Sequence, residues 1–239
     1  MTDLDVLAEG ARTLGVNLDE HQFAQFQAYL DGMGAWNEKI NLTSPSALAD
    51  AERVHLLDSL TLVPIIRLWN PVATRLVDIG SGAGLPGLAI KIAMPWLQVV
   101  LVEANRKKAE FLSWVVSTLK LSTVEVIHDR AEIVGHHTSF RESFDIATAR
   151  AVGTLPAVME LTLPLCKSGG TLLAQRGADA EREALEAESA TRKLGGLATV
   201  EWIETPGRGM SGVVVVRKAG KTPNQYPRRV GIPTKRPLT

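Results

Sequence analysis

The chain has 239 residues, of which 45% are hydrophobic and 22% charged, as in globular proteins and unlike disordered or fibrous ones. Its formal net charge is zero, and its single cysteine, Cys166, excludes an intrachain disulfide and a cysteine-based metal cluster. No stretch approaches the roughly 20 apolar residues of a membrane span, and the first residues do not resemble a signal peptide. We expect a cytoplasmic monomer without bound metal or membrane association.

The first 70 residues are predicted to be helical. Apolar side chains recur at three- and four-residue spacing from His21 to Asn37, with Asp19 as the N-cap. Shorter helices are expected at 4–14, 45–53 and 55–69. We expect region 1–70 to pack on the core that follows.

Residues 71–218 are predicted to alternate between strands and helices. Strands are expected at 75–79, 98–103, 124–127, 144–149, 171–175, 198–204 and 212–217. Helices are expected at 86–94, 105–119, 154–164 and 180–194. The first four strands alternate with helices or turns, as a parallel sheet requires. The last two are joined by a short Pro- and Gly-containing connection and are predicted to form an antiparallel hairpin.

The last segment, 219–239, is basic and rich in proline, and is predicted to be extended. From Arg217 to Thr239 there are seven basic residues and no acidic one, against 19 basic and 26 acidic residues in the remainder. A basic tail on an acidic body indicates either a polyanionic partner such as RNA or a solubilising tail.

The most informative segment is DIGSGAGLPG, from Asp78 to Gly87, between a strand and a helix. Gly80, Gly82 and Gly84 allow the backbone to turn sharply and to approach a ligand closely. The loop also contains G-x-G-x-x-G, with Glu103 about 20 residues downstream. The glycine pattern alone therefore indicates NAD as readily as S-adenosylmethionine.

Asp78 favours S-adenosylmethionine. In a dinucleotide site a pyrophosphate occupies the helix N-terminus, where an adjoining carboxylate would repel it. S-adenosylmethionine carries a sulfonium and an ammonium group and no phosphate, so an acid is favourable there. Glu103 would accept hydrogen bonds from both ribose hydroxyls. Ala131 and Glu132, after the third strand, are expected beside the adenine, unless they only begin a helix.

The residue types present limit which chemical groups can be the methyl acceptor. Carbon-5 methylation of pyrimidines needs a cysteine nucleophile, and Cys166 lies in a Leu-rich stretch that indicates packing. The Asn/Asp-Pro-Pro-aromatic tetrad used for exocyclic amines is absent after the fourth strand, where 147–152 is ATARAV. Guanine N7 has a free lone pair and needs neither device, because alignment with the methyl group suffices. A small-molecule methyltransferase and, less favoured, an NAD-dependent oxidoreductase remain alternatives.

Several segments together resemble the bacterial small-subunit (16S) ribosomal RNA guanine-N7 methyltransferases, also called the glucose-inhibited division protein B family. The matching segments are NLT at 41–43, HLLDS at 55–59, the glycine loop at 78–87, RKKAEFL at 106–112, RAE at 130–132, ARA at 149–151 and YPRRxGxPxKxPL at 226–238. The resemblance implies an α/β, Rossmann-like class I methyltransferase fold. Its sheet would be doubly wound, mostly parallel and seven-stranded, with an antiparallel terminal hairpin and N-terminal helices.

The resemblance also implies a cofactor, S-adenosylmethionine, and a substrate, a guanine of 16S ribosomal RNA near the decoding centre, presented as RNA or as a small ribosomal subunit. The cofactor contacts that it implies are Gly80, Leu85, Glu103, Ala104, Asn105, Ala131, Glu132 and Arg150. The pattern of the glycine loop adds Asp78, Gly82 and Gly84 to the predicted cofactor-binding residues.

Arg150 follows the fourth strand, where open α/β sheets bind ligands, so it is also the candidate catalytic residue; the alternative is an ion pair with a surface acid. Arg176, Arg228 and Arg229 are the candidate RNA contacts. The family usually has Lys-Gly where this chain has Arg176-Gly177, which leaves the role of Arg176 open. His55 and Asp58, one helical turn apart, belong either to the pocket or to the helix surface.

Overall fold

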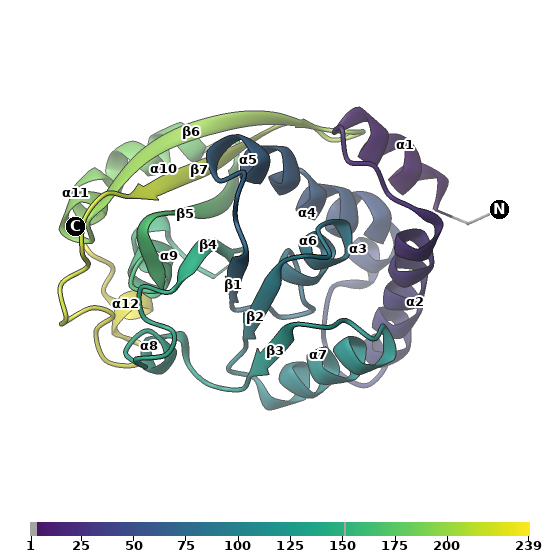
Figure 1. Cartoon of the computed structure of the whole chain (residues 1–239), viewed down its shortest axis with the longest axis horizontal. Coiled ribbons are helices and arrows are strands. Elements are labelled where there is room, and N and C mark those ends of the chain that lie inside the picture. Colours follow the sequence, from purple (N-terminus) through teal and green to yellow (C-terminus); the bar gives the residue numbers. More distant parts are fainter. Residues whose placement is uncertain (1–3, 151) are drawn as a thin grey trace.

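The computed structural model describes residues 4–150 and 152–239, and a seven-stranded sheet forms its centre (Figure 1). The strand order is β3-β2-β1-β4-β5-β7-β6. The strands are β1 (Arg75–Ile79), β2 (Gln98–Val102), β3 (Val124–Ile127), β4 (Phe144–Ala149), β5 (Cys166–Gly177), β6 (Gly196–Thr205) and β7 (Gly209–Lys218). Strands β1 to β5 pair in parallel, and β7 is antiparallel to both β5 and β6. The predicted fold class, terminal hairpin included, is confirmed.

Helices precede and connect the strands, and α2 has the N-cap that the sequence predicts: Asp19 accepts from the Gln22 amide, and the Gln22 side chain accepts from the Asp19 amide. Before the sheet come α1 (Asp5–Thr13), α2 (Glu20–Asn37), α3 (Pro45–Ala49), the π-helical segment η1 (Glu52–Leu57), α4 (Asp58–Leu60) and α5 (Leu62–Trp69). Later helices are α6 (Gly87–Ala93), α7 (Arg106–Thr118), α8 (Ala131–Val134), α9 (Leu155–Thr162), α10 (Ala180–Glu186), α11 (Glu188–Lys193) and α12 (Ile232–Lys235). None of these described helices is both long and apolar enough to cross a bilayer.

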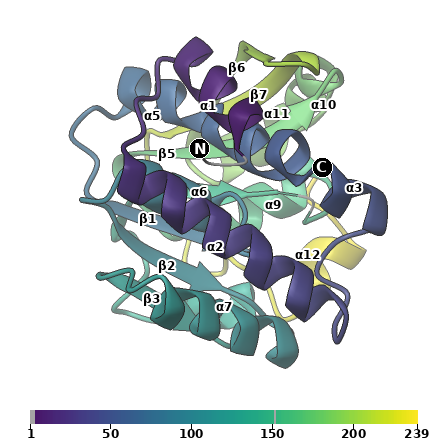
Figure 2. The same cartoon turned by 90° about the vertical axis from the view of Figure 1, so that its right-hand side faces the viewer.

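Each face of the sheet has its own hydrophobic core, because side chains alternate along a strand. Leu76 and Val99 pack with helices α1 to α7 on one face, whereas Val77 and Val100 pack with helices α8 to α11 on the other. Figure 2 shows α2 and α7 lying across the first face. The N-terminal helical region therefore shares one continuous core with the sheet.

Some elements differ from the prediction. Strands β5, β6 and β7 are longer than predicted. For β6 and β7 the reason is their pairing, since ten consecutive residue pairs join them. The predicted helix at 180–194 is divided at Ala187. The tail was predicted to be extended, which is wrong at 232–235, where α12 forms: Gly231 has a φ of +78° before it, and Pro233 lies in its first turn, a position that tolerates proline.

Asp145 of β4 fixes the start of β1 beside it. Its Oδ2 accepts hydrogen bonds from the amides of Thr74 (2.9 Å) and Arg75 (2.8 Å), and its Oδ1 pairs with Lys167. Burial alone would raise the pKa of Asp145, but the ion pair and the amides bring it below its usual value.

We expect Asp145→Ala to lower the free energy of unfolding by about 2 kcal/mol at neutral pH, because two partly buried amides lose a charged acceptor. The depressed pKa means that this contribution is present above pH ~4 and is lost as the pH falls further. Urea denaturation at pH 7 and pH 3 measures both effects. Glu125→Ala, an exposed change in β3, is the control, and an equal loss in the two variants would contradict the prediction.

Candidate functional site

A cavity of about 140 Å³ lies at the carboxyl ends of β1, β2 and β3. It is lined by Ile79, Gly80, Val102, Glu103, Ala104, Asp129, Arg130, Ala131, Glu132, Val152, Leu161 and Thr234. The chain leaves β1 and β4 toward opposite faces of the sheet, which is where open α/β sheets bind ligands. Pockets for whole small molecules are usually roughly 300–1,000 Å³, so this cavity suits one half of a larger ligand.

Glu103 is the central polar group of the cavity. It is 8% exposed, and its Oε2 accepts from the Gly82 amide (2.8 Å) while its Oε1 accepts from the Asn105 amide (2.7 Å). Gly82 has a φ of +56°, a conformation that favours glycine, and this turns its amide toward the carboxylate. Each carboxylate oxygen keeps a further lone pair. Glu103 is therefore a fixed acceptor for ligand hydroxyl groups.

Asp78 lies beneath the glycine loop and is fully buried. Its Oδ1 accepts from the Thr148 hydroxyl (2.9 Å), and its Oδ2 accepts from the Gly87 amide at the start of α6 (3.2 Å). Burial raises the pKa of Asp78 to about 6, although these hydrogen bonds oppose the shift. A carboxylate thus already occupies the start of α6. A pyrophosphate at this position would meet a satisfied amide and a negative charge.

Arg150, directly after β4, is held by the segment that spans η1 and α4. Its Nη1 donates to Asp58 Oδ2 (2.9 Å), and its Nη2 lies 3.5 Å from His55 Nδ1. Burial, together with the Arg150 cation, lowers the pKa of His55 to about 4, so the imidazole is neutral at pH 7. Since a guanidinium only donates, Nδ1 accepts and Nε2 donates to the Thr43 hydroxyl (2.8 Å).

Comparisons with known proteins agree with this geometry. Residues 22–202 match the family described as rRNA small subunit methyltransferase G, or GidB. The chain belongs to this family. It is 45% identical to ribosomal RNA small subunit methyltransferase G of Chloroflexus aggregans, over 98% of this chain and 97% of that one. The protein of the same name from Roseiflexus castenholzii is 44% identical, over 98% of this chain and 100% of that one.

Solved structures of lower identity share the fold. Cofactor-bound Rv0187 from MTB superposes with a TM-score of 0.56 at 18% identity, covering 82% of this chain and 89% of that one. A Corynebacterium glutamicum protein gives the same TM-score at 17% identity, over 81% of this chain and 91% of that one. Membership of the rRNA small subunit methyltransferase G family identifies the chain as a methyltransferase, and these structures show that the fold is shared.

The structure brings most of the predicted cofactor residues together. The residues that line the cavity are Gly80, Glu103, Ala104, Ala131 and Glu132. The others do not line it: Gly82, Gly84 and Leu85 belong to the glycine loop, Asp78 accepts from the Gly87 amide, and the Asn105 amide donates to Glu103. Arg150 is also outside the lining. Direct contact of each residue with a cofactor stays a prediction.

The candidate RNA residues have different surroundings. Arg176 Nε donates to Glu183 Oε2 (2.7 Å), and its Nη1 donates to the Gly153 carbonyl (2.9 Å). Arg228 pairs with Glu160, which is fully buried. The guanidinium of Arg228 is therefore engaged inside the protein, whereas Arg229, like Arg236, is exposed to solvent.

Seven lining residues were not predicted as cofactor contacts. Four of them, Ile79, Val102, Asp129 and Arg130, are sequence neighbours of residues that were predicted or of one another. The other three, Val152, Leu161 and Thr234, come from after β4, from α9 and from α12. Val152 follows the ARA match within two residues, so extending that segment identifies it. Leu161 and Thr234 carry no local signal, because only the folded chain brings them to β2 and β3.

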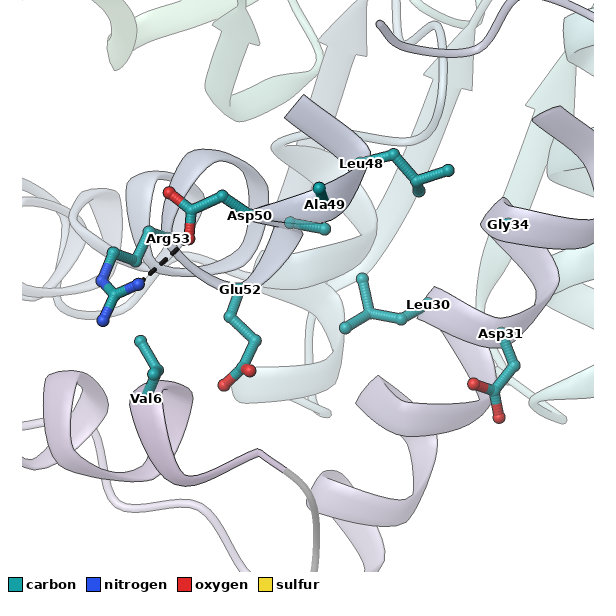
Figure 3. Close-up of a pocket in the computed structure, with 10 residues that line it drawn as sticks. Val6, Leu30, Asp31, Gly34, Leu48, Ala49, Asp50, Glu52 and Arg53 are labelled. Atoms are coloured by element: carbon teal, nitrogen blue, oxygen red, sulfur yellow. Dashed lines mark hydrogen bonds and ion pairs between the residues drawn. The ribbon is translucent and has the colours of Figure 1, made fainter. Parts of the chain in front are cut away.

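A larger cavity of about 450 Å³ lies among the N-terminal helices (Figure 3). Val6 of α1 and Leu30 of α2 line it, with Asp50 and Arg53 paired at its side. It shares no lining residue with the cavity beside the glycine loop. Among the described residues, no group of three or more His, Cys, Asp and Glu side chains is arranged to hold a metal ion.

The raised pKa of Asp78 predicts a specific pH dependence of stability. A carboxyl group that ionises less readily when folded contributes stability that is complete below pH ~4 and is lost as the pH rises through about 6. A shift of about two units corresponds to about 3 kcal/mol. We expect Asp78→Asn to remove this part of the decline between pH 4 and 7, as measured by denaturant unfolding.

Thr148→Val is the matched control for Asp78→Asn. It keeps the Asp78 carboxyl but removes the hydroxyl that lowers its pKa, so the decline should extend to higher pH. Identical pH profiles for the wild-type protein and Asp78→Asn would contradict the assignment.

Proposed function

We propose that this protein transfers the methyl group of S-adenosylmethionine to N7 of a guanine in small-subunit ribosomal RNA. The observation that carries the proposal is Glu103, a buried carboxylate held by the glycine loop at the edge of the sheet in a chain of the rRNA small subunit methyltransferase G family. The proposal implies that the protein acts in the cytoplasm, where ribosomal subunits are. A monomer is sufficient, because all the proposed site residues come from one chain.

The residues present fit an S-adenosyl ligand. Glu103 offers acceptors for the two ribose hydroxyls, and the apolar side chains of Val102, Val152 and Leu161 suit an adenine face. Asp78 occupies the position that a dinucleotide would need for its pyrophosphate, which disfavours the NAD alternative. When bound, S-adenosylmethionine supplies a methyl group on a positively charged sulfur, which leaves as a neutral thioether when the carbon–sulfur bond breaks.

The acceptor follows from the side chains near the carboxyl edge of the sheet. Cys166 begins β5 at the opposite edge, is fully buried, and has a pKa raised to about 12 by burial, so it is not available as a nucleophile. Guanine N7 attacks with its own lone pair and loses no proton. The protein has then only to align the base and exclude water.

Arg150 is the residue best suited to orient the guanine. Arginine commonly binds O6 and N7 of guanine together, but N7 must stay free to receive the methyl group. A single contact to O6 from a guanidinium fixed by Asp58 and His55 meets that condition. The base would leave its stack to reach this edge. Arg176 and Arg229 remain candidate phosphate contacts.

We expect the purified protein to bind S-adenosylhomocysteine in calorimetry. Glu103→Ala should weaken binding by roughly 10- to 100-fold, because charge-assisted hydrogen bonds are lost. Gly82→Val should abolish it, since valine disfavours a φ of +56°. Arg106→Ala, an exposed change on α7, is the control. Tighter binding of NAD than of S-adenosylhomocysteine would refute the cofactor assignment.

We expect Arg150→Ala to reduce the turnover number with ribosomal RNA roughly 100-fold at saturating cofactor, while cofactor affinity stays near the wild-type value. Asp58→Asn should act in the same direction more weakly, because it removes the negative charge that holds the guanidinium and keeps only a neutral acceptor. The measurement is transfer of a labelled methyl group to small ribosomal subunits. Rescue of Arg150→Ala by excess cofactor would instead make Arg150 a cofactor anchor.

Mapping of N7-methylguanine in ribosomal RNA from cells with and without the gene tests the substrate. We expect one guanine of the small-subunit RNA to lose its methyl group in the deletion strain and to regain it with the wild-type gene, but not with Glu103→Ala. Unchanged methylation would exclude the proposed substrate.

A further inference from the structure

The C-terminal segment 226–236 folds back over the cavity beside the glycine loop. Figure 1 shows it in yellow beside α8 and α9, and hydrogen bonds join it to both helices. Its α12 brings Thr234 into the lining, with Leu161 of α9 and Ala131 of α8. One wall of the cavity thus comes from a segment about 100 residues further along the chain than α8.

Glu132 joins this segment directly to the cavity. It is 7% exposed, lines the cavity, and accepts through Oε1 from the Gly231 amide (2.7 Å). Gly231 has a φ of +78°, so a residue with a side chain would be strained there. The side chain that lines the site therefore also positions the start of α12.

Arg228 anchors the same segment to α9. Its backbone amide and its Nε both donate to Glu160 Oε1 (2.8 Å each), and its Nη2 donates to Glu160 Oε2 (2.6 Å). Nη2 also donates to the carbonyl of Arg236 (2.8 Å), which closes the chain around α12. Glu160 is fully buried next to Leu161, so this carboxylate depends on Arg228 for its partner.

A third contact fixes the beginning of the segment. His136 Nε2 lies 2.6 Å from the Pro227 carbonyl oxygen, and Arg141 Nη1 donates to the Tyr226 carbonyl (2.8 Å). A Cβ atom on Gly135 would lie 2.6 Å from Pro227 Cγ, closer than real Cβ atoms approach a neighbour. Gly135 therefore allows the segment to reach α8.

We propose that segment 226–236 is a wall of the cofactor pocket and that its docking sets cofactor affinity, with Thr234 contacting the adenosine half of the ligand. This inference rests on the proposed function. The Thr234 hydroxyl donates and accepts, as does the edge of adenine. Because the guanidinium of Arg228 is committed to Glu160, it acts through the pocket wall, whereas the exposed Arg229 is free to meet RNA phosphate.

The test compares the affinities of three variants for S-adenosylhomocysteine by calorimetry. Gly135→Ala should displace Pro227 and raise the apparent Kd at least about tenfold. A tenfold rise corresponds to a segment 226–236 that is docked about one-tenth of the time. Thr234→Val removes only the hydroxyl and should raise the Kd roughly fivefold. Arg228→Ala should act like Gly135→Ala, and Arg228→Lys should restore part of the affinity.

Arg229→Ala is the matched control for Arg228→Ala. It should keep wild-type cofactor affinity but lower the salt dependence of binding to a 16S ribosomal RNA fragment, by a slope of up to ~0.7–0.9. Arg228→Ala should show the opposite pattern. A lower salt slope with normal cofactor affinity in Arg228→Ala would overturn the proposal in favour of an RNA-binding tail.

Hydrogen exchange supplies a readout that does not depend on activity. S-adenosylhomocysteine should slow exchange of the amides at 229–236 in the wild-type protein, and these amides should exchange faster in Gly135→Ala. Undocking without any change in Kd would overturn the proposal. Failure of the wild-type protein to bind S-adenosylhomocysteine would instead refute the proposed function. If the Gly135→Ala variant is destabilised as a whole, so that its melting temperature falls, the Kd of Thr234→Val tests the proposal instead. An unchanged Kd in Thr234→Val would show that Thr234 does not contact the ligand.

Discussion

The site depends on two buried carboxylates that hold the glycine loop between them. Asp78 accepts from the amide of Gly87 at the end of the loop, and Glu103 accepts from the amide of Gly82 at its centre. A buried charge is costly unless hydrogen bonds satisfy it. The loop amides meet that need, and in return the loop is fixed in one conformation. Tyr29 of α2 adds a third restraint by donating to the Ala83 carbonyl.

The N-terminal helices complete the site from the other side. Through His55 and Asp58 they hold Arg150, and Asp58 Oδ1 also lies 3.6 Å from Arg208 in the β6–β7 hairpin. One carboxylate thus stands between two guanidinium groups, and the nearby imidazole of His55 is neutral. The group formed by Asp58, Arg150 and Arg208 is therefore net positive, which favours a polyanionic substrate such as RNA.

The sheet and the glycine loop were predictable from the sequence because their signals are local. Short runs of apolar residues identify the strands, and Gly80, Gly82 and Gly84 occupy backbone conformations that other residues disfavour. The burial of Asp78 was not predictable in the same way. It lies in β1, buried beside Val77 and Ile79, and its carboxylate accepts from Thr148 and Gly87, contacts that no local sequence signal indicates.

For the tail, composition was informative but the contacts could not be predicted, because they are made with residues far away in the sequence. Basic and proline-rich residues are typical of an extended RNA-binding arm. However, Arg228 meets Glu160 across 68 residues of sequence, and Glu132 meets Gly231 across 99. Glu160 lies in an otherwise apolar helix, LPAVMELT, where a buried acid needs a cation from elsewhere.

The N-terminal helical region and the C-terminal tail both reach the carboxyl edge of the sheet because of how the sheet is wound. Helices α1 to α7 cover one face and α8 to α11 the other, so the N-terminal helices approach β4 from one side while the tail reaches α8 and α9 from the other. Arg150 and Thr234 therefore belong to different faces. The proposed contacts to the guanine and to the cofactor are therefore made by different parts of the chain. Under the proposed function, changes among the N-terminal helices would act on Arg150 and the base, whereas changes in the tail would act on the wall beside Glu132.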